Sequence, residues 1–119
     1  MFRETLQQIV DSTEGSLAGV VMDSAGVAID TYARPDAGFD IDTIGVEYGV
    51  LLGSIRRATE SLEAGSTQEV AIGAEKVFTI IRTLGESYYV ALALRPDGNL
   101  GKGRYLLRIA SPRLLAELS

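Results

Sequence analysis

Apolar residues recur at helical spacing along the stretch from residue 39 to residue 65 and gather on one wide stripe. The stripe consists of Ile41, Ile44, Tyr48, Leu51, Leu52, Ile55, Ala58 and Leu62. Asp40 is placed to cap the first free amides, and Gly65 to end the helix in a left-handed conformation. The pattern predicts one long helix over residues 39–65, with its apolar stripe facing a core.

Shorter amphipathic patterns predict a helix at each end of the chain and five strands between them. The first helix covers residues 2–11 and the last segment residues 100–118, where Pro112 is expected to kink or split the helix. The strands are predicted over residues 16–22, 27–33, 67–73, 77–83 and 88–94. The order is therefore helix, two strands, long helix, three strands and helix.

The strand order follows from which strands are apolar on both faces. The first and the last strand carry apolar residues at alternating positions in both registers, which is typical of the middle of a sheet covered by helices. The second and third strands then lie at the edges. We expect an α+β fold with a five-stranded antiparallel sheet in the order 2-1-5-4-3. The long helix covers one face and the two terminal helices the other.

With 119 residues, the chain has room for a single domain over residues 1–119.

The long helix also carries glycines at every fourth position on a second side. Gly45, Gly49 and Gly53 form a bare row beside Val46 and Val50. Each interior glycine costs roughly 0.5–1 kcal/mol relative to alanine. A row of small residues lets another backbone approach closely. We interpret the row as the contact with a second molecule. The alternative is that the glycines only fit the helix against its own sheet.

The third strand supports the same interpretation, because it is predicted at an open edge. Glu69 is the one charge in residues 67–73, and no proline blocks pairing there. A second copy related by a two-fold axis would cover the glycine row and the strand edge together. The predicted dimer interface consists of Gly45, Val46, Gly49, Val50, Gly53, Glu69, Val70, Ala71 and Ile72.

The element order and two local sequences resemble the roadblock/dynein light chain family over essentially the whole chain. These sequences are the hairpin Gly-Val-Val-Met-Asp-Ser-Ala-Gly-Val over residues 19–27 and the stretch over residues 99–107. The resemblance implies a profilin-like three-layer sandwich that dimerises through its second helix and third strand. It also implies, for bacterial members of the MglB type, binding to a small Ras-like GTPase and an effect on its nucleotide cycle. Other members of this family are scaffold or motor subunits.

In the GTPase regulators, the partner sits on the surface that the two long helices form together. Carried to this chain, the partner-binding residues are Glu47, Ser54, Arg57 and Ser61. Our first hypothesis is a homodimeric regulator of a small Ras-like GTPase. A structural adaptor that binds a peptide or a larger assembly in any nucleotide state is the alternative, and a small-ligand sensor is a third. The identity of the GTPase, the nucleotide step that is affected and pairing with a paralogue stay open.

Charge and composition exclude several other partners. A net charge of −5 and a pI near 4.6 argue against a nucleic-acid backbone or an anionic membrane. Cysteine is absent, which excludes disulfides and thiolate zinc sites. No apolar run reaches the roughly 18 residues of a membrane span, and the first residues show no signal pattern. We therefore expect a cytoplasmic protein without membrane insertion.

The residues that usually carry catalysis are largely missing. Histidine is absent as well, which removes the commonest general base and metal ligand, so we expect no enzyme, metal or cofactor. The glycine-rich stretch 98–104 departs from a phosphate-binding loop, because Pro96 occupies the place of the first glycine. Arg56 and Arg57 point about 100° apart on a helix, so at most one could act on a bound GTPase. We interpret both as rim or ion-pair residues.

Overall fold

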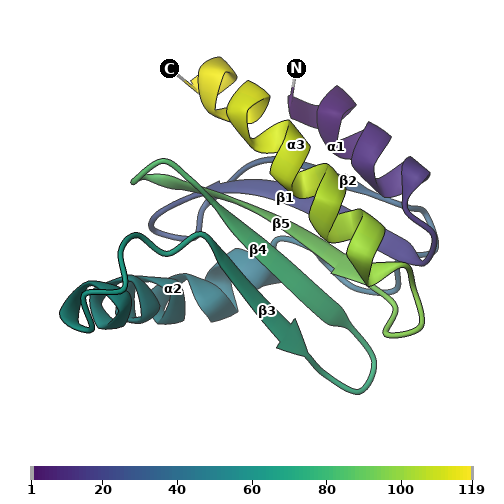
Figure 1. Cartoon of the computed structure of the whole chain (residues 1–119). Helices are drawn as coiled ribbons and strands as arrows, with labels where there is room; N and C mark the ends of the chain where they lie inside the picture. The colour runs from purple at the N-terminus through teal and green to yellow at the C-terminus, as the bar shows by residue number, and fades with distance from the viewer. Residues whose placement is uncertain (1, 119) are drawn as a thin grey trace.

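A five-stranded antiparallel sheet separates one long helix from two terminal helices (Figure 1). The computed structural model describes residues 2–118. Its elements are α1 (Phe2–Ser12), β1 (Ser16–Asp23), β2 (Ala28–Ala33), α2 (Thr43–Ser61), β3 (Glu69–Gly73), β4 (Phe78–Leu84), β5 (Tyr88–Leu94) and α3 (Leu100–Leu118). The strand order is β2-β1-β5-β4-β3. The predicted fold class and strand order are confirmed.

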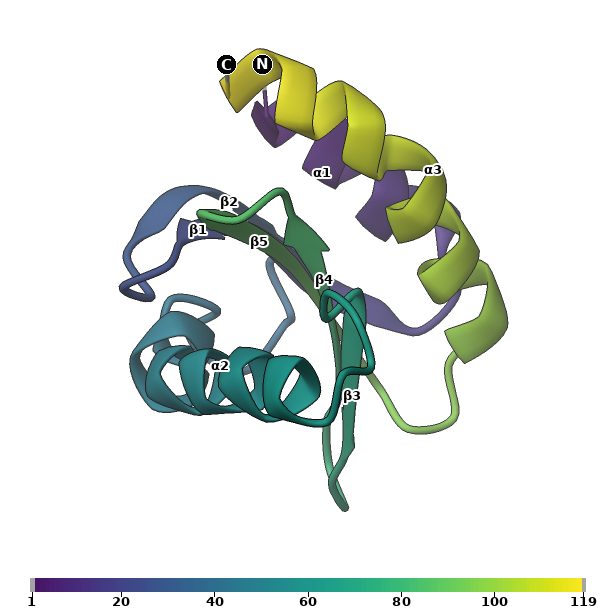
Figure 2. The same cartoon turned by 60° about the vertical axis from the view of Figure 1, so that its left-hand side comes forward.

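The sheet buries apolar side chains on both of its faces. Figure 2 shows the helix layers that cover these faces, α2 on one side and α1 with α3 on the other. On the side of α1 and α3, Leu6 and Leu107 pack with Leu92 of β5. On the side of α2, Leu52 packs with Tyr89 of β5. Successive residues of a strand point to opposite faces, so the central strand β5 contributes to both cores. This explains why its sequence is apolar almost without interruption.

Helix α2 is shorter at both ends than the pattern predicts. The Asp40 carboxylate accepts a hydrogen bond from the Asp42 amide at 3.0 Å, in a turn that precedes the first helical residue, Thr43. At the other end, Glu63 already has a φ of 56°, whereas the predicted stop, Gly65, has a φ of 90°. The prediction that Gly65 ends the helix is therefore wrong, because the chain leaves the helical conformation two residues earlier.

Helix α3 runs through Pro112 without division, so of the predicted kink or split the split does not occur. Leu107 and Leu114 are buried on either side of the proline and anchor both halves of the helix to the sheet. Pro112 itself is exposed. A proline removes one hydrogen bond from a helix interior. Here that loss falls on the solvent side, where water can satisfy the carbonyl that has lost its partner.

Candidate functional site

Two of the three glycines of α2 contact the β1–β2 turn of the same chain. A Cβ atom on Gly45 would overlap the backbone carbonyl of Gly26, and one on Gly49 would lie 3.2 Å from the Gly26 Cα atom. Gly26 itself has a φ of +84°, a left-handed conformation that suits glycine. The turn backbone can approach the helix backbone this closely only where neither side has a side chain. The interpretation that Gly45 and Gly49 are bare for a second molecule is therefore wrong.

The third glycine and the two valines have a different environment. A Cβ atom on Gly53 would meet only the Nη1 atom of Arg57, at an ordinary contact distance of 3.6 Å. Val46 and Val50 are 73% and 80% exposed, on the side of α2 that faces away from the sheet. Isolated apolar side chains on a surface are common, but two on successive turns of one helix form a patch. These residues remain candidates for an interface.

Two leucines that the sequence pattern places in the core are also exposed, Leu51 next to Val50 in sequence and Leu62 at the C-cap of α2. Leu51 and Leu62 are 54% and 77% exposed, whereas Leu52 is buried. Adjacent residues of a helix point about 100° apart, so Leu51 and Leu52 cannot both face the sheet. The sequence spacing does not show which of the two is buried, and only the structure assigns the core position to Leu52. We call Val46, Val50, Leu51 and Leu62 the α2 apolar surface.

Strand β3 presents an open edge of the sheet. Within residues 2–118, β3 pairs only with β4, in the register of Val70 with Ile81. Val70 and Ile72 pack into the core that α2 covers, and Ala71 is exposed. Glu69 forms an ion pair with Arg104 of α3, at 2.9 Å. In the chain, β3 follows α2 after the loop over residues 62–68, which both views show (Figures 1 and 2).

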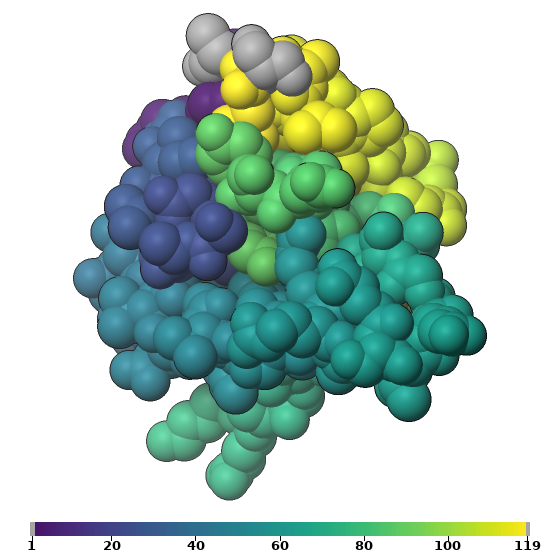
Figure 3. All heavy atoms as spheres, turned by 90° about the vertical axis from the view of Figure 1, so that its left-hand side faces the viewer, coloured from purple at the N-terminus to yellow at the C-terminus, as the bar shows by residue number. Residues whose placement is uncertain are grey.

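The four residues that the family resemblance assigns to a partner all lie on exposed positions of α2. These residues are Glu47, Ser54, Arg57 and Ser61. The Arg57 guanidinium donates a hydrogen bond from Nη2 to the Ser54 hydroxyl oxygen at 3.2 Å. Figure 3 shows α2 spanning this face of the molecule, beneath the β1–β2 turn in dark blue and the β4–β5 turn in green. The structure thus leaves all four predicted partner residues exposed on the helix that carries Val46 and Val50, and their role stays a prediction.

The neighbouring arginines of α2 differ in their environments. Arg56 donates from Nε to the Tyr89 hydroxyl at 2.8 Å and from Nη2 to the Gly85 carbonyl at 3.2 Å. Its guanidinium also lies over the Tyr89 ring, 4.7 Å from the centroid. Tyr89 is 2% exposed, so Arg56 satisfies the hydroxyl of a buried side chain. Of the two arginines, Arg57 is the exposed one.

Replacing Arg56 is therefore expected to lower stability. Arg56→Ala removes a stacking contact and leaves the Tyr89 hydroxyl without its protein partner, and we expect a loss of about 1–2 kcal/mol in the free energy of unfolding. Arg57→Ala, the matched control on the next position, should change it by less than about 0.5 kcal/mol. Urea unfolding of both variants measures the difference. Equal effects of the two substitutions would contradict the structural role of Arg56.

The described residues offer few groups for chemistry. Within residues 2–118 no three acidic side chains come together in a way that could hold a metal ion. The amide of Lys102, at the start of α3, donates to the side-chain oxygen of Asn99 at 3.1 Å. The glycine-rich stretch thus forms the start of its own helix, in keeping with its departure from a phosphate-binding loop.

No helix among these residues combines the length and apolarity that crossing a membrane takes.

Solved structures resemble the chain over nearly its whole length. MglC from Myxococcus xanthus is 42% identical, with a TM-score of 0.70, and the match covers 98% of both chains. The gliding protein MglB from Thermus thermophilus is 20% identical, with a TM-score of 0.85 over 98% of this chain and 88% of that one. A Roadblock/LC7 domain from Streptomyces avermitilis is 14% identical, with a TM-score of 0.75 over 95% and 97%. No family model and no curated protein sequence matches the chain.

Proposed function

The chain belongs to the roadblock family of MglB- and MglC-like proteins, and from this premise we propose that it is a homodimeric, non-catalytic binding partner of a small Ras-like GTPase. The single observation that carries the proposal is the α2 apolar surface, and the open edge of β3 is in keeping with it. Val46 and Val50 are the most exposed large apolar residues of the helix interior. A solvated patch of this kind is typical of an interaction site.

A second copy of the chain is the partner that covers both features at once. A two-fold axis would set one α2 against the other and one β3 edge against the other, which joins two sheets into one. The half-buried Gly53 then supplies a place where the two helices approach closely, since nothing but Arg57 lies near its missing side chain. Gly45 and Gly49 have no part in this interface, because Gly26 of the same chain occupies that side.

The GTPase would bind across the paired helices. The exposed residues Ser54 and Arg57 flank the valines on the same outer face of α2, so dimerisation would bring two sets of them together. The protein would then act by holding the switch loops of the GTPase rather than by supplying catalytic groups. Such binding depends on loop conformation and hence on the bound nucleotide.

A direct binding experiment tests the proposal. We would mix the purified protein with the small Ras-like GTPase encoded nearest to its gene, loaded either with GDP or with a non-hydrolysable GTP analogue. We expect the dissociation constants of the two states to differ by about tenfold or more, which corresponds to roughly 1.4 kcal/mol. Arg57→Glu should weaken the preferred complex. Arg95→Glu, on an exposed loop residue that pairs with Asp97, should leave it unchanged.

Two outcomes would count against the proposal. Failure of the GTPase to bind in either state would remove the proposed partner. Equal binding in both states would favour the structural adaptor, because an adaptor surface ignores the nucleotide. Both readouts are separate from the oligomeric state, which light scattering measures on the protein alone.

A further inference from the structure

Helix α3 is apolar on two opposite sides. Its inner side buries Leu107 and Leu114 against the sheet. Its outer side carries a second stripe at helical spacing, whose members are all exposed. This stripe consists of Tyr105, Ile109, Pro112 and Ala116. Ile109, in the middle of the stripe, is 53% exposed. An apolar stripe needed only for the fold would face the sheet, so the outer stripe requires another explanation.

Positive charge flanks this outer stripe on both sides. The cations of α3 are Lys102, Arg104, Arg108 and Arg113, and Glu117 is its one acid, which makes the helix +3 in a chain of −5. Arg104 is paired with Glu69 of β3, and Arg113 lies 3.7 Å from Glu117. Arg108 lies over the Tyr105 ring, 5.6 Å from its centroid. The charge of α3 is thus opposite in sign to that of the rest of the molecule.

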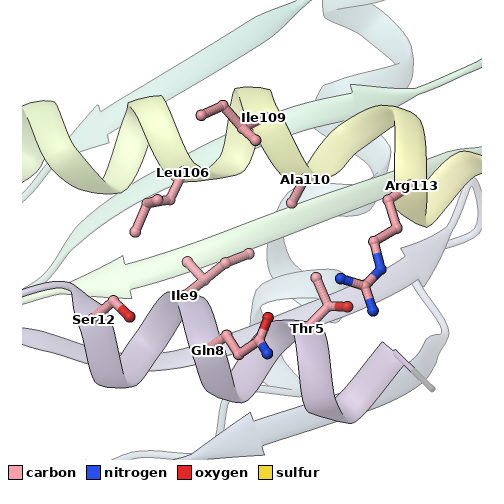
Figure 4. A pocket seen from close by; sticks show the side chains of 8 residues that line it. All are labelled: Thr5, Gln8, Ile9, Ser12, Leu106, Ile109, Ala110 and Arg113. Carbon is pink, nitrogen blue, oxygen red and sulfur yellow. The ribbon is translucent and has the colours of Figure 1, made fainter.

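A groove of ≈ 340 Å³ lies between α3 and α1, beside the outer stripe (Figure 4). Ile9 and Leu106 point toward one another across it, with Ala110 next to them. On the α1 side the rim is polar but uncharged, with Gln8 and Ser12. The groove is therefore apolar inside and uncharged on the α1 rim, and its α3 rim carries one cation, Arg113, 3.7 Å from Glu117.

A buried hydroxyl at one end of the groove has no hydrogen-bond partner among residues 2–118. Thr5 is 4% exposed and lines the groove, yet its Oγ1 atom has no hydrogen bond within the described chain. Figure 4 shows Arg113 reaching from α3 toward Thr5. Most buried polar atoms in folded proteins are hydrogen-bonded. A polar group of a bound segment could satisfy Thr5 while its carboxylates pair with Arg113.

We propose that the α1–α3 groove binds an amphipathic helix of a partner protein, one whose apolar stripe is flanked by acidic residues. A groove between two helices can hold a third helix, whose side chains at positions i, i+4 and i+7 would contact Ile9, Leu106 and Ile109. A flat bilayer would not enter such a hollow, and the net charge of the chain opposes an anionic one. The groove lies on the face of the sheet opposite α2, so it is independent of the proposed GTPase surface.

The test uses a display library of 18-residue helical peptides with randomised surface positions, selected on the full-length protein. We expect the selected peptides to combine an apolar stripe with Asp or Glu on its flanks. Ile109→Asp should weaken their binding at least about tenfold, since it places a charge in the apolar contact. Arg113→Gln should weaken it several-fold and reduce its dependence on salt. Val27→Asp, at a residue that is 60% exposed on the β1–β2 turn, is the control and should have no effect.

Several results would overturn the proposal. Selection of no binder, of binders without acidic enrichment, or of binders indifferent to Ile109→Asp would each do so. Sedimentation with anionic vesicles, lost in Ile109→Asp, would show that a membrane is the occupant. A lower mass of Ile109→Asp in light scattering would show that a second copy is. Thermal unfolding of each variant verifies that the fold is intact, because Ile109 and Arg113 are exposed and their replacement should leave it so.

Discussion

Replacing Gly45 by alanine is expected to destabilise the protein by about 3 kcal/mol, although alanine is the better helix former. The added methyl group would overlap the carbonyl of Gly26, a backbone atom that cannot rotate away as the end of a side chain can. The β1–β2 turn would have to separate from α2, or the helix would have to shift over the sheet. Urea unfolding of Gly45→Ala against the original protein measures this loss.

Alanine substitutions at Gly49 and Gly53, four and eight residues after Gly45, are the controls, and their expected effects on stability differ in size. In the isolated subunit, Gly53→Ala should raise the free energy of unfolding by roughly 0.5–1 kcal/mol, because the new methyl group meets only the flexible end of Arg57. The free energy of unfolding of Gly49→Ala should lie between those of the other two variants, since its Cβ atom would lie 3.2 Å from the Gly26 Cα atom. A Gly45→Ala variant as stable as Gly53→Ala would contradict the intrachain role of Gly45. Substitutions at Gly45 or Gly49 are accordingly no test of dimerisation.

Replacing Val46 and Val50 together by aspartate is expected to abolish self-association at micromolar concentration while leaving the subunit folded. In the proposed dimer the two valines of each chain are buried, and burial of each contributes roughly 1.5–3 kcal/mol. Four carboxylates near the two-fold axis would also repel one another. The dissociation constant should rise by about two orders of magnitude or more. Light scattering and sedimentation equilibrium measure it.

The matched control for this pair lies on the other helix layer. Tyr105 and Ile109 of α3 are likewise exposed apolar residues four positions apart, and their replacement by aspartate should leave the dimer intact. Stability in urea should be nearly unchanged for the Tyr105 and Ile109 variant, because neither side chain is part of either core. For the Val46 and Val50 variant it should fall towards that of the isolated subunit, because the dimer no longer contributes. If the original protein proves to be monomeric, or if the Val46 and Val50 variant stays dimeric, α2 does not form the interface.

The sequence alone determined the layers and the order of the sheet. The pattern of β5 required burial on both faces, which a strand has only between two neighbours and two helix layers. The weaker pattern of β2 placed it at an edge, and the structure agrees. Hydrophobic periodicity is enough for such inferences because each side chain follows the direction that its local backbone imposes. The exact ends of α2 depended on local turns and were predicted less well.

The tertiary structure decided what contacts each residue that the helical pattern places away from the core. A glycine row shows only that some backbone comes close, and whether this is Gly26 of the same chain or another molecule depends on the path of the β1–β2 turn. In the same way, Arg56 and Arg57 are identical in type and adjacent in sequence, but only Arg56 reaches Tyr89. The periodicity of a helix states which side a residue faces. The groups that the residue contacts on that side belong to segments far away in the sequence, and these segments come together only when the protein folds.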